Sequence, residues 1–80
     1  MRIISQNGKF DLPYENLAIF VEYENVIARF ENERYLLGQY SSEAKAIKAI
    51  EMLRKAWKFE TGIYHGNIIF QFPKDSEIEV

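Results

Sequence analysis

The sequence predicts an α+β fold in which an antiparallel, meander-type β-sheet of about five to six strands packs on one amphipathic helix at about residues 42–58. Two patterns support this class. Short β-branched and aromatic runs separated by turn residues fill the first forty positions, whereas residues 42–58 repeat apolar side chains with the period of an α-helix. The expected order is ββ-βββ-α-β in a single domain over residues 1–80, because 80 residues are the size of one domain.

The first strand pair is expected at the N-terminus. Residues 2–6 read as a short strand and Asn7-Gly8 as a tight turn, because this dipeptide accepts the positive φ angles of hairpin turns. Residues 9–12 then return as the partner strand, and Pro13 ends it.

Three further strands are expected as an antiparallel meander, at residues 17–23, 26–30 and 34–40. Glu24-Asn25 and Asn32-Glu33 are the expected turns between them. Neither turn contains the glycine that is typical of tight hairpins.

The helix is the clearest element of the sequence. Ser41 and Ser42 offer an N-cap, and Glu43 follows in the first turn, where a negative charge complements the helix dipole. At 100° per residue one face gathers an apolar stripe, formed by Ala46, Ile50, Leu53 and Trp57. The opposite face is largely polar and holds Lys48, Glu51, Met52 and Lys55. The stripe therefore predicts Trp57 to be a core residue rather than a ligand contact.

The region after the helix is expected to contain a loop or short hairpin, marked by Gly62 and Gly66. Residues 67–72 follow as a strand that Pro73 ends. The acidic tail over residues 75–80 is expected on the surface.

Composition and charge restrict the location and the partners. There is no cysteine and no apolar run of membrane-spanning length, so we expect a cytoplasmic protein without disulfides or a membrane partner. The net charge is −2, which disfavours nucleic acid as a partner. Residues 42–58 nevertheless carry five basic and two acidic side chains, so a basic helix face is one candidate binding surface.

The sequence shows no catalytic, metal-binding or cofactor-binding signature, and we expect none. His65 is the single histidine and has no companion ligands at metal-binding spacing and no nucleophile motif. Two carboxylates in a cleft would suffice for glycoside hydrolysis. The acidic residues Glu22, Glu24, Glu31 and Glu33, however, fall at predicted strand ends and turns, where acids commonly protect sheet edges.

Three blocks of sequence resemble a family of small uncharacterised proteins from Gram-positive bacteria and from their phages and prophages. They are residues 1–8 with 11–15 (MRIISQNG and DLPYE), the helix at 40–56, and residues 70–75 (FQFPKD) with the acidic ending. The resemblance covers about half of the chain and implies no activity and no catalytic residue. It implies a context, namely an accessory protein of a phage or mobile element in a bacterial host cell.

In that context we expect a non-enzymatic binding protein that antagonises host antiphage defence, by one of two mechanisms. Acidic strands and the tail, with Glu22, Glu24, Glu31, Glu33, Asp75 and Glu77, could mimic nucleic acid and occupy a basic cleft of a host protein. Alternatively, a homo-oligomer could sequester a small anionic nucleotide signal between subunits, with Arg29, Arg34, Arg54 and Tyr64 as contacts.

Other surfaces and functions remain open at this point. The Lys48–Met52–Lys55 face of the helix and the Tyr64-His65 loop are further candidate partner surfaces. One alternative is a small regulatory module that binds nucleic acid through the basic helix face. Another is a small hydrolase that uses His65 and carboxylates.

Overall fold

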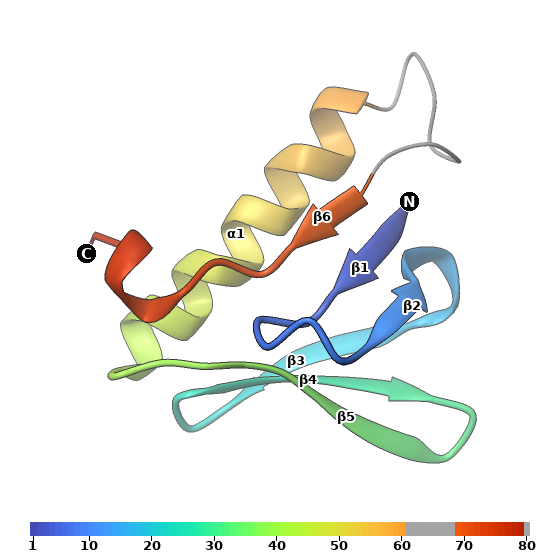
Figure 1. Cartoon of the computed structure of the whole chain (residues 1–80), viewed down its shortest axis with the longest axis horizontal. Helices are drawn as coiled ribbons and strands as arrows, with labels where there is room; N and C mark the ends of the chain where they lie inside the picture. The colour runs from blue at the N-terminus through green and yellow to red at the C-terminus, as the bar shows by residue number, and fades with distance from the viewer. Residues whose placement is uncertain (61–68, 80) are drawn as a thin grey trace.

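The computed structural model describes residues 1–60 and 69–79, and its architecture confirms the predicted α+β class. Six strands and one helix follow one another in the predicted order along these residues (Figure 1). Their bounds are β1 (Arg2–Ile4), β2 (Asp11–Pro13), β3 (Ala18–Glu22), β4 (Asn25–Phe30), β5 (Glu33–Gln39), α1 (Glu43–Glu60) and β6 (Ile69–Gln71). Two short 3₁₀ turns complete the list, η1 (Tyr14–Asn16) before β3 and η2 (Asp75–Glu77) after β6.

The strands form two sheets of three strands each, whereas the sequence predicts a single sheet of about five to six strands. The first sheet has the order β2-β1-β6, and β6 runs parallel to β1, whereas β1 and β2 are antiparallel. The second sheet is the antiparallel meander β3-β4-β5. A parallel pair requires a crossover connection, and the chain between β1 and β6, which includes α1, provides it.

Both turns of the meander lie one residue earlier than predicted, at Tyr23-Glu24 and Glu31-Asn32. Tyr23, Glu31 and Asn32 all have positive φ angles, of 58°, 54° and 76°. Positive φ at both central residues is the geometry of a type I′ turn, which matches the twist of the flanking strands. The chain thus makes the Glu31-Asn32 turn without glycine.

The helix confirms its predicted cap and stripe. The Ser42 hydroxyl accepts a hydrogen bond from the Lys45 N–H at 3.2 Å, which is the geometry of an N-cap. Ala46, Ile50 and Leu53 are buried as predicted, and α1 contacts β3 and β4 with this face. The core lies between this face of α1 and the inner faces of both sheets, with Ile3, Leu37 and Phe72 among its most buried members.

The acidic tail is more integrated than predicted. Ile78 is 4% exposed and belongs to the core, so the tail does not simply lie on the surface. The Asp75 carboxylate accepts a hydrogen bond from the Ser41 N–H at 2.7 Å and lies 3.3 Å from the Lys45 ammonium. The Tyr40 hydroxyl donates to the Pro73 carbonyl at 2.8 Å. These contacts attach the C-terminal segment to the start of α1.

The Asp75 contacts predict a specific pH dependence of stability. The backbone N–H of Ser41, and secondarily Lys45, holds the pKa of the Asp75 carboxyl below its usual value. Asp75 therefore contributes stability above the unfolded-state pKa of about 3.9, and this contribution is lost as the pH falls through the lower folded-state value. Asp75→Asn should lower the urea midpoint at pH 7, and the difference from the wild type should shrink below about pH 4.

Asp11→Asn, which removes an exposed carboxylate paired with Arg2, controls for the general effect of net charge. An Asp75→Asn difference in the urea midpoint that stays constant from pH 7 to pH 2 would contradict this assignment.

The predicted loop at Gly62 and Gly66, with Tyr64 and His65, lies outside the described residues.

Candidate functional site

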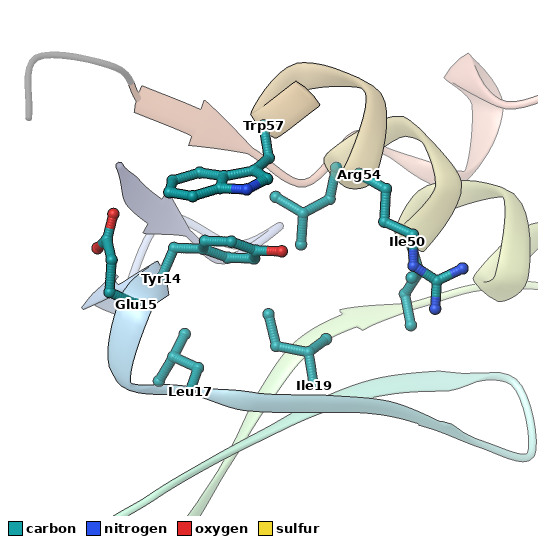
Figure 2. A pocket seen from close by; sticks show the side chains of 8 residues that line it. Tyr14, Glu15, Leu17, Ile19, Ile50, Arg54 and Trp57 are labelled. Carbon is teal, nitrogen blue, oxygen red and sulfur yellow. The ribbon is translucent and has the colours of Figure 1, made fainter. Parts of the chain in front are cut away.

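A cleft between β3 and α1 is a candidate site in the described part of the chain. Its volume is about 450 Å³, within the range of about 300–1,000 Å³ that is typical of ligand pockets. Figure 2 shows β3 along one side of the cleft and α1 along the other. The lining residues are Tyr14, Glu15, Leu17, Ile19, Ile50, Leu53, Arg54 and Trp57. We call this the β3–α1 cleft.

The floor of the cleft is apolar because both elements turn their core-facing side chains toward it. Leu17 precedes β3 and Ile19 lies on the inner face of that strand, where both pack against the core. Ile50 and Leu53 come from the buried stripe of α1 and are 7% and 1% exposed. The floor of the cleft is therefore fixed in place by the core beneath it.

Two stacked aromatic rings close one end of the cleft. Tyr14 from η1 and Trp57 from α1 have ring centroids 4.8 Å apart with their planes tilted by 42° (Figure 2). The Tyr14 N–H donates to the Met1 carbonyl at 3.0 Å, which anchors η1 to the first sheet. Trp57 packs against the core as predicted, but it is only half-buried and also lines the cleft. The structure thus places Trp57 at the cleft as well as against the core.

Two charged residues, Glu15 and Arg54, lie on opposite sides of the cleft (Figure 2). The Glu15 carboxylate lies 2.8 Å from the N-terminal ammonium group of Met1, so its charge is engaged. Arg54 is exposed, and none of the ion pairs between described residues includes it. The cleft therefore presents one guanidinium group that can receive an anion.

The other two predicted arginines lie on the far side of the meander. Arg29 and Arg34 face each other directly on β4 and β5, and they share the face of Phe20. Arg34 pairs with Glu22 at 2.8 Å and covers the Phe20 ring at 5.7 Å. Since Ile19 points into the cleft, Phe20 and both arginines point away from it. Within one chain the structure does not bring Arg29, Arg34 and Arg54 together.

The predicted helix face is only partly a free surface. Lys48 and Lys55 are exposed, but Met52 is half-buried and packs against the core. Lys48 and Met52 line a shallower hollow of about 360 Å³ together with residues 76–79. The C-terminal turn, which was expected to lie free, thus explains why a methionine occupies this face.

The acidic residues do not form one surface. Glu22 and Glu24 lie at the β3–β4 turn, whereas Glu31 and Glu33 lie at the β4–β5 turn. Figure 1 shows these turns at opposite ends of the meander. Asp75 is engaged with Ser41 and Lys45. A nucleic-acid mimic would need these charges in one row, and the fold separates them.

Catalytic chemistry finds little support in the described residues. No group of three or more His, Cys, Asp or Glu side chains within residues 1–60 and 69–79 could hold a metal ion. Glu15 is the single carboxylate among the residues that line the β3–α1 cleft, whereas glycoside hydrolysis uses two. His65 and Tyr64 lie outside the described residues, so the structure does not place them.

Comparison with known proteins adds no family: no family model, no curated protein and no solved structure matches the chain. The resemblance to a phage and prophage family therefore stays a prediction. Along the described residues, no helix combines the length and the apolar character needed to cross a membrane.

Proposed function

We propose that this chain is a non-enzymatic binding protein whose β3–α1 cleft receives a ligand with an apolar body and an acidic group. The observation that carries the proposal is the Arg54 guanidinium, which forms no ion pair with any of the described residues, beside an apolar, aromatic-walled cleft. Pockets of this kind use their apolar walls for affinity and a few polar groups for orientation. The apolar floor excludes water, which strengthens an ion pair formed at its rim.

The resemblance to phage and prophage proteins supplies a biological setting for the proposal. In that setting the protein acts in the bacterial cytoplasm and antagonises a host defence factor by occupying it. This setting rests on the sequence blocks at 1–15, 40–56 and 70–75 and on analogy with other small phage accessory proteins.

Of the two expected ligand classes, the charge layout favours a host protein over a nucleotide. A nucleotide carries several phosphate charges, which proteins commonly meet with clusters of arginine, lysine and backbone N–H groups. The cleft of one chain supplies Arg54, while Arg29 and Arg34 lie on the opposite face of the meander. A homo-oligomer that brought those arginines to the cleft of a neighbouring copy would be needed for nucleotide sequestration.

The test is a charge reversal at the cleft with a matched control on the other face of α1. Arg54→Glu should weaken ligand binding at least about tenfold, because it replaces an attraction by a repulsion next to an apolar surface. Lys55→Glu makes the same change of charge one residue later, outside the residues that line the cleft, and should bind like the wild type.

The measurement is native mass spectrometry of tagged protein purified from a Gram-positive host, followed by affinity titration of the retained species. Equal retention by wild type, Arg54→Glu and Lys55→Glu would refute the cleft as the binding site. Conversion of the retained species into a product would refute a non-enzymatic role.

A further inference from the structure

β3 forms one edge of the meander. The sheet order is β3-β4-β5, so β3 has β4 on one side and no strand of the described chain on the other. The β3–β4 turn has two residues, which makes Glu22 and Asn25 a hydrogen-bonded pair. Because such pairs alternate along an antiparallel ladder, Phe20 and Ala18 also bond to β4. The N–H and C=O groups of Ile19 and Val21 therefore point to the free edge.

Within the described residues, β3 itself carries no lysine, proline or bulge that would protect this edge against pairing. Natural sheets protect their edges with lysine, proline, bulges or a covering element. The five residues of β3 are Ala-Ile-Phe-Val-Glu, without lysine or proline, and the register irregularity of this sheet lies between β4 and β5. The charge of Glu22 is engaged with Arg34. The edge is thus a pairing-competent strand of high β-propensity.

The β3–α1 cleft lies directly beside this edge. Leu17 and Ile19 form its β3 side, while Ile50, Arg54 and Trp57 form its α1 side (Figure 2). A strand added next to β3 would lie about 4.8 Å from it, and alternate side chains would point to the inner face, as Ile19 does. Those side chains would enter the cleft, and an acidic one among them would meet Arg54.

We propose that the ligand of the β3–α1 cleft is an extended segment of a partner protein that adds to β3 as a further strand. The segment alternates apolar side chains, which fill the cleft, and includes one acidic side chain, which pairs with Arg54. Main-chain hydrogen bonds to Ile19 and Val21 supply affinity in this mode of recognition, and the side chains that enter the cleft supply specificity. This inference rests on the proposed function, because it assigns a partner class to the same cleft.

Charge complementarity favours such a partner over a second copy of this chain. In a symmetric pair of β3 strands the side chains facing the cleft would be Ile19 and Val21 of the neighbour. The acidic residue of β3 is Glu22, which lies on the outer face with its partner Arg34. No acidic group of a second β3 would therefore reach Arg54, whereas an acidic peptide segment satisfies it.

The experiment selects peptides and then tests their backbone. A display library of random ten-residue peptides is selected on the intact protein, and the best binder is synthesised with single N-methyl groups at successive residues. N-methylation removes an amide donor and blocks pairing on that side of the peptide. The affinity should therefore fall at least about tenfold when the N-methyl group is at every second residue, and change little when it is at the residues between them. The selected peptides should contain an acidic residue within an alternating apolar pattern. Their binding should fall for Arg54→Glu and persist for Lys55→Glu.

The other outcomes separate the two proposals. Binding that depends on Arg54 but shows no alternation with N-methylation would overturn strand addition and leave the cleft as the binding site. Failure to select any peptide would overturn the peptide ligand, and a nucleotide that is retained by the wild type but lost with Arg54→Glu would still support the cleft. Peptide binding unaffected by Arg54→Glu would overturn both. A dimer in sedimentation that N-methylated and unmodified peptide both fail to dissociate would assign the edge to a second copy and overturn the inference.

Discussion

Replacement of Leu37 by alanine is expected to lower the free energy of unfolding by about 2–5 kcal/mol. Leu37 is 0% exposed in β5, and its side chain is part of the core between α1 and the two sheets. The small size of the chain leaves few neighbours that could collapse into the cavity. Because domains of this size have stabilities at the lower end of about 5–15 kcal/mol, the variant should unfold at much lower urea concentration. Circular dichroism during urea titration measures the change.

The adjacent residue provides the control. Leu36 is 41% exposed and lies on the outer face of the meander, opposite Ile27. Leu36→Ala makes the same chemical change one position earlier and should cost less than about 1 kcal/mol. Similar losses for Leu36→Ala and Leu37→Ala would show that β5 does not present these two side chains to opposite environments.

The helix could be predicted from the sequence because its signals are local. A serine cap followed by apolar residues at helical spacing defines one buried face, and the structure buries Ala46, Ile50 and Leu53 on it. Turn-forming residues also located the strands of the meander to within one or two positions. These features depend on a few neighbouring residues, and tertiary contacts did not override them.

The pairing of strands could not be predicted in the same way. The strand predicted at residues 34–40 contains Leu36 and Leu37 in succession, so alternation alone does not say which one faces the core. The register shift between Val26 and Ile27 determines which leucine faces the core, because Ile27 pairs with Leu36 and Val26 pairs with Gly38. The division into two sheets likewise depends on the pairing of β6 with β1, which are far apart in the sequence.

The candidate site was predicted in part. Arg54 was among the expected ligand contacts, and the structure places it at the cleft. Tyr14, Leu17 and Ile19 were missed, and Trp57 was assigned to the core alone. No local pattern marks Tyr14, because its partner Trp57 lies more than forty positions away in the chain. A site made where two distant elements meet is visible only once the fold is known.

A methyl group added at Gly38 is expected to destabilise the fold by about 1–3 kcal/mol, because the position is sterically closed. A Cβ atom there would lie 2.7 Å from Cε2 and 2.8 Å from Oη of Tyr40. The Tyr40 ring is 4% exposed, and its hydroxyl donates to the Pro73 carbonyl. The ring therefore cannot move aside without breaking a hydrogen bond worth about 1 kcal/mol that joins β5 to the C-terminal segment.

The clash with Tyr40 can be separated from any other effect of Gly38→Ala by a double-mutant cycle. Leucine at position 40 keeps an apolar group but lacks the ring atoms that approach Gly38. In a Tyr40→Leu background, Gly38→Ala should stabilise the protein by about 0.5–1 kcal/mol, because alanine loses less backbone entropy than glycine in a strand. The sign of the stability change caused by Gly38→Ala thus depends on the residue at position 40. Urea denaturation of the four variants measures the coupling energy between the two positions. A loss of equal size in both backgrounds would mean that the Gly38 backbone, rather than the Tyr40 ring, requires glycine at this position.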